Sequence, residues 1–252
     1  MVLLIDIGNT NTHIGLGDAA RVQRRTEFPT AVWSGARAES YLKRFVKDAQ
    51  LDGAAVCSVV PQATVLARRI LRRLRILPVF ELTARTVRTI GIEYPKPSTI
   101  GPDRLANAAA ARHRFGAPVV AIDFGTAVTI DVVDQQGNFV GGIIAPGLDA
   151  LLCAMHERTA LLPRVQFRKV SRAIGRSTKE AMLLGAQYAL TGLVHEALVA
   201  IKRELGTEQL QVVATGGCAR LLCHNLRELT ALVPDLTLEG LRLQWFANLL
   251  ET

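Results

Sequence analysis

The feature that most constrains this chain is a structural unit that occurs twice. Val2–Gly17 (VLLIDIGNTNTHIGLG) is an apolar stretch that runs into Asp6, reverses at Gly8–Asn11 and continues as a second strand-like stretch. Val119–Val133 (VVAIDFGTAVTIDVV) repeats the design around Asp123. Two copies of a strand, an Asp-x-Gly turn and a returning strand predict a duplicated fold.

Each turn carries groups that suit a polyphosphate and its metal ion. The aspartate offers a carboxylate to a cation, the glycine lets an anion approach the backbone closely, and Asn or Thr side chains donate hydrogen bonds. Two such turns facing each other would hold a nucleotide from both sides, and they resemble the phosphate loops of the actin, sugar-kinase and heat-shock-ATPase superfamily. The alternative is a pair of ordinary hairpins, because Asn and Gly also favour turns for conformational reasons. The presence of two copies favours the nucleotide site.

The order of predicted elements supports the same fold. From Val2 to Leu82 the patterns read βββαβαβ, and the order restarts at Val119 after a junction at Gly116–Pro118. We therefore predict an α/β protein of two duplicated actin-like, ribonuclease H-like lobes, each a mixed sheet with helices, with the active site in the cleft between them. The predicted lobes are residues 1–117, with the first phosphate loop, and 118–252, with the second.

Composition indicates a globular chain. Hydrophobic residues make up 49% of the 252 residues, and the four cysteines follow no regular spacing for disulfides or zinc. A strand that begins at Val2 leaves no charged region for a signal peptide, so we expect a cytoplasmic protein. The most apolar long segment, Leu183–Ile201, is interrupted by polar residues, which predicts a buried amphipathic helix and no membrane insertion.

The net charge of +8 raises the question of nucleic acid. The densest basic run has five arginines within residues 68–75, interleaved with Ile70, Leu71 and Leu74. This spacing is typical of a helix with one solvated face and one core face, and no aromatic residues accompany it. We predict no nucleic-acid partner, with an accessory DNA or RNA role as the alternative.

The segment Gly91–Arg104 (GIEYPKPSTIGPDR) is the most unusual in the chain. Its three prolines restrict the backbone and disfavour sheet pairing, which predicts a loop. Pro102 suits a first helical turn, so Asp103 and Arg104 are expected at a helix N-terminus. A first-turn acid can simply complement the helix dipole, and this is the alternative to a functional Asp103.

Taken together, the motifs resemble type III pantothenate kinase over nearly the whole chain and in the family's order. They are Asp6-x-Gly8-Asn9-Thr10, Gly101-x-Asp103-Arg104, Asp123-x-Gly125-Thr126-x-x-Thr129, Gly141–Leu148 and Thr215-Gly216-Gly217. The resemblance implies an enzyme that phosphorylates pantothenate with ATP to give 4'-phosphopantothenate, the first step of coenzyme A biosynthesis.

The resemblance also implies roles for individual residues. The expected ATP-binding residues are Asp6, Ile7, Gly8, Asn9, Thr10, Asn11, Thr12, His13, Thr126, Gly216 and Gly217. The expected pantothenate-binding residues are Tyr94, Gly101, Pro102, Asp103, Arg104 and Thr178, with Asp103 as the catalytic base. Asp123 would bind a monovalent cation, potassium or ammonium, and Asp6 would face the magnesium ion that accompanies ATP. The family further implies a homodimer formed through the second lobe.

Several alternatives remain open at this stage. Pro102 stands where the family often has alanine, His13 could be an outward-facing strand residue, and Thr178 could be a plain helix N-cap. The acceptor could be a sugar, acetate or another small molecule, although the Tyr94–Arg104 loop lacks an obvious sugar-binding array of acids and amides. A transcription accessory factor is the other rival, and the intact Asp103 argues against it.

Overall fold

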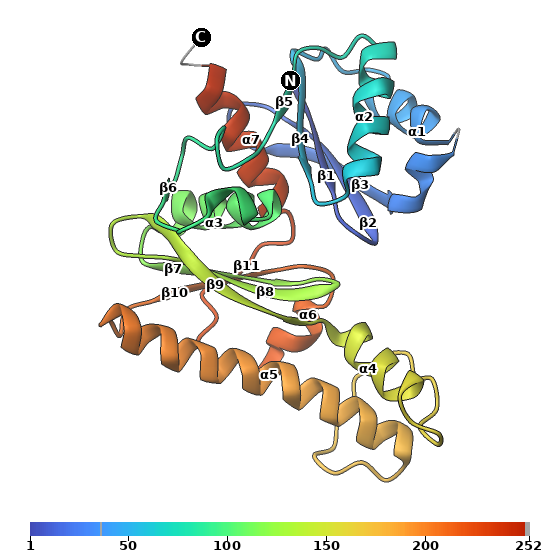
Figure 1. Ribbon diagram of the computed structural model, residues 1–252, viewed down its shortest axis with the longest axis vertical. Coiled ribbons are helices and arrows are strands. Elements are labelled where there is room, and N and C mark those ends of the chain that lie inside the picture. The colour runs from blue at the N-terminus through green and yellow to red at the C-terminus, as the bar shows by residue number, and fades with distance from the viewer. Residues whose placement is uncertain (36, 250–252) are drawn as a thin grey trace. The chain divides into compact units, whose positions relative to one another are not determined.

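The computed structural model describes residues 1–35 and 37–249, and its contacts divide the chain into two compact units (Figure 1). The first unit comprises Met1–Gly116, Gly137–Val140 and Asp235–Thr252, and the second comprises Ala117–Gln136 and Gly141–Pro234. The division between Gly116 and Ala117 lies within the predicted junction. The C-terminal segment from Asp235 differs from the prediction, which assigned it to the second lobe, because its helix packs against the first sheet.

The first unit is built on a five-stranded sheet with the order β3-β2-β1-β4-β5. The strands are β1 (Val2–Ile7), β2 (Asn11–Gly17), β3 (Val22–Pro29), β4 (Gly53–Ser58) and β5 (Val79–Glu81). Strands β1, β2 and β3 form an antiparallel meander, whereas β4 and β5 run parallel to β1. All six residues of β1 are buried, as expected of a central strand covered on both faces.

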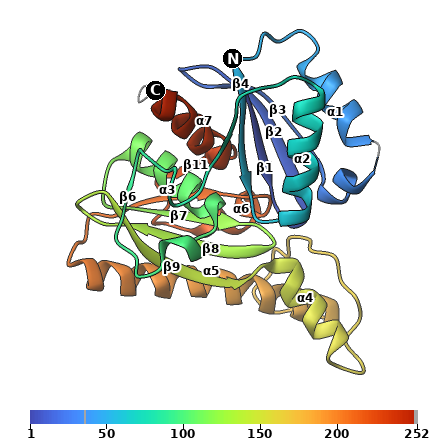
Figure 2. The same ribbon diagram turned by 45° about the horizontal axis from the view of Figure 1, so that its top comes forward.

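Helices cover both faces of this sheet (Figures 1 and 2). On one face, α1 (Arg37–Val46) and α2 (Pro61–Arg73) share a core with Leu3, Ile5 and Ile7. On the other face, α7 (Leu236–Leu249) contacts β1 and β4 and packs along α3 (Pro102–Phe115). Gly240 permits the close approach of these two helices, because a Cβ at this position would lie 1.9 Å from the Ala106 carbonyl oxygen.

The second unit contains β7 (Val119–Phe124), β8 (Ala127–Val133), β10 (Gln211–Thr215), β11 (Ala231–Leu232) and most of β9 (Asn138–Pro146). These strands follow one another in the sheet order β11-β10-β7-β8-β9. The antiparallel β7–β8 pair repeats the β1–β2 hairpin of the first unit, and β10 lies parallel to β7. The predicted duplication is therefore visible in the strands themselves.

Three helices accompany this second sheet: α4 (Leu148–Glu157), α5 (Thr178–Leu205) and the short α6 (Ala219–Leu222). Helix α5 runs along the sheet (Figure 1) and contains the whole of the predicted helical segment Leu183–Ile201. Among the described residues, α5 is the one helix whose length and apolar composition would allow it to cross a membrane, properties that a core helix of a globular protein also has.

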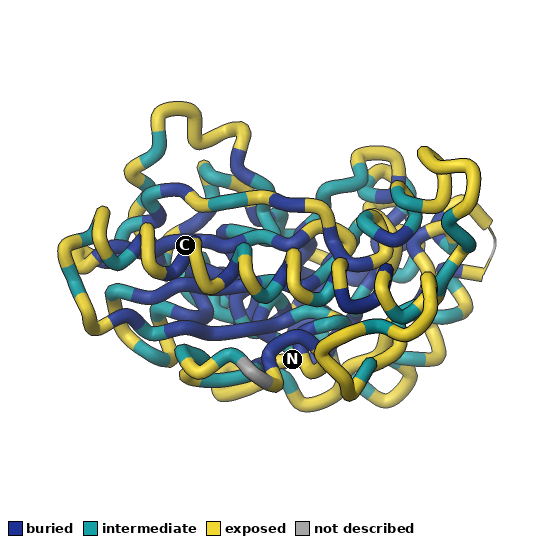
Figure 3. Tube along the Cα trace, turned by 90° about the horizontal axis from the view of Figure 1, so that it is seen from below, coloured by how far each residue is buried: buried dark blue, intermediate teal, exposed yellow. Residues whose placement is uncertain are grey.

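Buried positions follow the strands, whereas connecting segments are largely exposed (Figure 3). The segment before α3 shows one difference from the predicted loop. Its first two residues form β6 (Gly91–Ile92), which pairs with Asn138 and Phe139 at the start of β9, residues that belong to the first unit. Prolines at 95 and 97 follow this short strand and end the pairing, in agreement with their lack of a donor N–H group.

Candidate active site

A buried hydroxyl network holds the first Asp-x-Gly turn. Within the turn, the Gly8 N–H donates to the Asn11 carbonyl at 3.0 Å. Thr30 then fixes the turn from outside: its hydroxyl donates to the Gly8 carbonyl at 2.7 Å, and its N–H donates to the Thr10 carbonyl at 2.8 Å. These bonds constrain the backbone of residues 8–11, and the side chains of residues 9–11 are exposed to solvent.

Thr12 and Trp33 complete this network. The Thr12 hydroxyl lies 3.0 Å from that of Thr30 and accepts a hydrogen bond from the Trp33 indole N–H at 2.9 Å. Thr12, Thr30 and Trp33 are all buried. Of the residues predicted to bind ATP, Thr12 and Ile7 therefore have side chains that face the protein interior, so any contact they make with a nucleotide would come from the backbone.

Asp6 lies at the end of β1 among ionisable neighbours. It pairs in register with His13 on β2 and with Cys57 on β4, and it is 91% buried. Burial raises the pKa of the Cys57 thiol well above its usual value, and the Asp6 and Asp103 carboxylates raise it further, with a hydrogen bond to Asp6. The structure thus brings Asp6, Cys57 and Asp103 into one electrostatic environment in the first unit.

His13 contacts Glu27 on β3, with Nδ1 3.2 Å from a carboxylate oxygen, and both side chains are about half exposed or more. Loss of solvent lowers the pKa of His13, and Glu27 opposes this shift. The ring therefore has a partly exposed ion-pair partner on β3, and a contact of His13 with phosphate stays a prediction.

Asp103 occupies the second position of α3. Pro102 is the first helical residue, as predicted, and Gly101 is the N-cap residue. The Asp103 carboxylate accepts a hydrogen bond from the Arg104 N–H at 2.9 Å. Burial raises the pKa of Asp103, while the Arg104 N–H and the Arg104 charge oppose the shift.

Gly101 leaves room for this position of the carboxylate. A Cβ at residue 101 would lie 2.4 Å from Asp103 Oδ1, and no side chain can tolerate such a contact without displacing the carboxylate. The absence of a side chain at residue 101 therefore lets the Asp103 carboxylate occupy this position.

The side chains of Tyr94 and Arg104 both contact Phe139, a residue that the sequence alone did not indicate. The Phe139 ring lies 6.1 Å from the Tyr94 ring in an edge-on arrangement, and the Arg104 guanidinium lies 5.4 Å from its centroid. Phe139 is fully buried, and its carbonyl accepts a hydrogen bond from the Glu93 N–H at 2.9 Å. Because Phe139 is far from both residues in sequence, no local pattern could reveal it.

The second unit contains the other Asp-x-Gly turn. The Gly125 N–H donates to the Ala127 carbonyl at 3.1 Å, and the Thr126 carbonyl accepts from the Gly147 N–H at 3.1 Å. A Cβ at Gly147 would lie 2.4 Å from the Thr126 oxygen, so the Gly141–Leu148 run packs directly on the turn. The Thr126 side chain is exposed.

The Thr215-Gly216-Gly217 motif lies beside Asp123. Thr215 pairs in register with Asp123, and a Cβ at Gly216 would lie 2.4 Å from Asp123 Oδ1. Gly216 also has φ +94°, a conformation that favours glycine. The predicted cation residue and the predicted adenosine turn are therefore neighbours within the second unit.

Thr178 is the first residue of α5 and does not cap it. Ser177 is the N-cap: its hydroxyl accepts from the Glu180 N–H at 3.2 Å, and the Glu180 carboxylate accepts from the Arg176 N–H at 2.8 Å. The N-cap alternative for Thr178 was wrong by one residue. Within the described part of the chain, the exposed Thr178 side chain makes no hydrogen bond to the Asp123 turn or to any other predicted site residue.

The donor groups suit cations that are shared with a substrate. No group of three or more His, Cys, Asp or Glu side chains capable of holding a metal ion occurs among residues 1–35 and 37–249. Magnesium is commonly held by one or two carboxylates together with substrate phosphates, so the single aspartate of the first turn fits this mode. Asp6 could serve a divalent ion in this way, and Asp123 could serve a monovalent one.

Comparison with known proteins gives a consistent result. The family model for type III pantothenate kinase matches residues 2–200. A type III pantothenate kinase of Methylacidiphilum infernorum is 42% identical over 244 residues, which cover 96% of this chain and 87% of that protein. Another, of Akkermansia muciniphila, is 42% identical over 248 residues, which cover 98% of this chain and 99% of that protein.

Solved structures agree on the fold. A Campylobacter jejuni protein described as belonging to a Baf family of transcriptional activators has a TM-score of 0.62 at 17% identity, covering 98% of each chain. The ROK hexokinase of Thermus thermophilus has a TM-score of 0.52 at 18% identity, covering 98% of this chain and 99% of that one. At these identities the likeness establishes the fold alone, and it confirms the predicted actin-like, sugar-kinase-like architecture.

Proposed function

This chain belongs to the type III pantothenate kinase family, and we propose on that premise that it transfers the γ-phosphoryl group of ATP to the primary hydroxyl of pantothenate. In this reaction the hydroxyl oxygen forms a bond to the γ-phosphorus, and the bond between that phosphorus and the bridging oxygen of ADP breaks. The hydroxyl proton goes to a base of the enzyme. The products are 4'-phosphopantothenate and ADP, at the entry to coenzyme A biosynthesis.

The arrangement around Asp103 is the observation that carries the proposal. A general base is most effective when its pKa approaches the working pH. Burial moves the pKa of Asp103 in that direction, and the Arg104 N–H holds the carboxylate in place. A first-turn acid that served only the helix dipole would gain nothing from such burial. We therefore assign Asp103 as the base that takes the proton from the acceptor.

The neighbouring residues are consistent with acceptor binding. Tyr94 and Arg104 contact the same Phe139 ring, so the two ends of the Tyr94–Arg104 segment share one support. Both residues are half-buried, and a tyrosine hydroxyl or a guanidinium on a fixed loop can bind an amide or carboxylate of the acceptor. We propose that Tyr94, Gly101–Arg104 and Thr178 bind pantothenate.

The two turns are proposed to bind the nucleotide. Residues 6–13 would bind the phosphates of ATP in the first unit, whereas Thr126, Gly216 and Gly217 would contact ATP from the second. Magnesium, bound with ATP near Asp6, would neutralise charge on the phosphate oxygens. Asp123 would hold potassium or ammonium, and its carboxylate lies beside the Gly216 turn.

We propose that the protein is a cytoplasmic homodimer with the subunits joined through the second unit. On α5, Tyr188 and Val199 are exposed by 51% and 39%, respectively, which supports a partner on that helix. The five arginines of residues 68–75 belong to α2 or follow it directly, and Arg68 forms an ion pair with Glu81, which supports a structural and solvating role for this charge.

An acceptor panel tests the proposed function. Purified protein with ATP, magnesium and potassium is assayed for ADP release with pantothenate, with hexoses and with acetate. We expect ADP release that depends on pantothenate and not on the sugars or acetate. Preference for a hexose or for acetate would assign the chain to another acceptor class and reject the proposal.

A further inference from the structure

A basic cavity lies at the edge of the first sheet, between strand β3 and helix α1, which are neighbours in Figure 2. Its volume is about 290 Å³. Three consecutive strand residues and three helix residues line it: Arg24, Arg25, Thr26, Tyr41, Arg44 and Phe45. We refer to this cavity as the β3–α1 pocket.

Strand register places the β3–α1 pocket on the face of the sheet opposite to Asp6. Asp6 pairs with His13, and His13 pairs with Glu27, so these three side chains share one face. Thr26 precedes Glu27 and therefore points to the other face. It pairs with Ile14, which packs in the core that α1 and α2 share with the sheet.

The pocket is also separated from the first Asp-x-Gly turn along the strand. Pro29 is the residue of β3 that pairs with Asn11 at the turn, and Thr26 is three residues away. This spacing corresponds to about 10 Å along an extended strand, and Arg24 is farther still. None of the six lining residues is among those proposed to bind ATP or pantothenate.

Aromatic rings hold two of the arginine side chains. The Arg24 guanidinium lies 4.8 Å from the centroid of the Phe45 ring and donates a hydrogen bond to the Phe45 carbonyl. The Arg44 guanidinium lies 5.3 Å from the centroid of the Tyr41 ring, which stacks on Phe28 at 5.4 Å. A guanidinium has five N–H groups, so most of these donors stay available to an acceptor.

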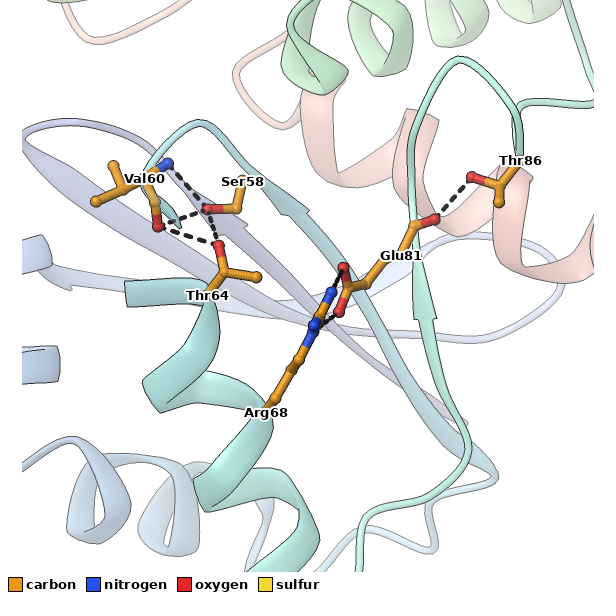
Figure 4. Close-up of polar contacts among 6 residues, drawn as sticks. All are labelled: Ser58, Val60, Thr64, Arg68, Glu81 and Thr86. Atoms are coloured by element: carbon orange, nitrogen blue, oxygen red, sulfur yellow. Dashed lines mark hydrogen bonds and ion pairs between the residues drawn. The ribbon is translucent and has the colours of Figure 1, made fainter. Parts of the chain in front are cut away.

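No acid balances the charge of this pocket within the described part of the chain. The lining contains no Asp or Glu, and its three arginines form no ion pair. The neighbouring acid Glu27 is paired with His13. By contrast, Arg68 of the same unit forms an ion pair with Glu81 (Figure 4). Because like charges in one pocket repel each other, a bound anion would relieve this repulsion.

We propose that the β3–α1 pocket binds a phosphate group, either as the free ion or as a small monoester. Three arginines supply the charge for a dianion, and a guanidinium matches the geometry of phosphate oxygens. The Thr26 hydroxyl, which makes no hydrogen bond to residues 1–35 or 37–249, can donate to a further oxygen. A carboxylate has one charge and two oxygens, so it would use fewer of these donors.

The test is a titration of the full chain followed by its backbone amide NMR spectrum, at a pH where phosphate is a dianion. The probes are inorganic phosphate, methyl phosphate, acetate and a short oligothymidylate, each added with and without saturating ADP and pantothenate. The proteins are the wild type, Arg44→Gln and Arg37→Gln. Arg37 is a matched control because it is an exposed arginine of the same helix and does not line the pocket.

We expect saturable shifts at Arg25, Thr26 and Arg44 with both phosphate probes, with a dissociation constant below about 1 mM. These shifts should persist when ADP and pantothenate are present. Acetate should bind about tenfold or more weakly. Arg44→Gln should weaken phosphate binding by about tenfold or more, whereas Arg37→Gln should leave it unchanged.

The two phosphate probes distinguish the sources of the group. Tighter binding of methyl phosphate would identify a monoester as the ligand, and tighter binding of inorganic phosphate would identify the free ion. A kinase assay gives a further check, because Arg44→Gln changes no residue proposed for the reaction. Activity near the wild-type level together with weakened phosphate binding would support a site separate from the kinase site.

Several results would overturn the proposal. These are the lack of a saturable shift with either phosphate probe, equal binding by the wild type and Arg44→Gln, and equal binding of acetate and methyl phosphate. Loss of the shifts on addition of ADP and pantothenate would assign the pocket to the kinase site instead. Tighter, salt-sensitive binding of the oligothymidylate than of methyl phosphate would identify a nucleic-acid backbone as the ligand and reject a small phosphate.

Discussion

Replacement of Asp103 by Asn separates a catalytic role from a structural one. Asn keeps an oxygen that can accept the Arg104 N–H, so the start of α3 should remain intact. It cannot take a proton at neutral pH. We expect turnover to fall by about 10² to 10⁴, the usual contribution of a general base, which corresponds to about 2.7–5.4 kcal/mol in the activation barrier.

The same substitution has the opposite expected effect on stability. The folded state raises the pKa of Asp103 above its ordinary value of 3.8, so the native protein binds this proton more tightly than the unfolded chain does. The free energy of unfolding therefore decreases as pH rises from 3.8 through the higher folded value, and this loss is complete above it. Because Asn carries no charge, the variant should be at least as stable as the wild type at neutral pH.

The assay combines steady-state kinetics with thermal unfolding at several pH values. Glu39→Gln is a suitable control, since Glu39 is also a first-turn acid and is paired with Lys43 and Arg73 on the surface. We expect the control to retain turnover and lose a little stability. A lowered melting temperature with unchanged turnover in Asp103→Asn would show a helix-start role and refute the assignment.

Four further predictions follow from the two units. Gly101→Ala should lower turnover by at least about tenfold, measured in the same kinetic assay, since the added methyl group displaces the base; retained turnover would show that the carboxylate can move without loss. Activity should require potassium or ammonium, and Asp123→Ala should remove this dependence together with most of the activity. Full activity of the wild type in sodium alone would reject the role of Asp123 as the ligand of the monovalent cation. Light scattering at assay concentrations should give a dimer, and a monomer would contradict the proposed assembly. A variant with alanine in place of Arg69, Arg72 and Arg73 should keep near-normal kinase activity. If the wild type bound DNA with sub-micromolar, salt-sensitive affinity and this variant did not, the alternative of a transcription accessory factor would be revived.

The local elements were largely predictable because their signals lie within a few residues. Pro61 and Pro102 mark the first positions of α2 and α3, as expected of proline at a helix start. The two Asp-x-Gly hairpins and the long helix α5 follow directly from the apolar patterns. The resemblance to a known family also rested on these short motifs.

Contacts between distant segments could not be predicted in this way. Thr30 and Trp33 hold the Gly8 turn from about 20 residues away, and Phe139 supports Tyr94 and Arg104 from a later strand. Their packing depends on how the strands are ordered, which a single sequence does not specify. The place of α7 in the first unit could not be predicted for the same reason. Gly240 indicates close packing of two helices only when Ala106 of α3 is known to lie against it.

Identification of the reaction product tests the central claim most directly. The protein is incubated with ATP, magnesium, potassium and pantothenate, and the product is examined by mass spectrometry and phosphorus–proton correlation NMR. The account predicts pantothenate with one added phosphoryl group, coupled to the methylene protons of its primary hydroxyl carbon, and almost none with Asp103→Asn. Release of ADP and inorganic phosphate without phosphorylated pantothenate, or phosphorylation at another oxygen, would contradict it.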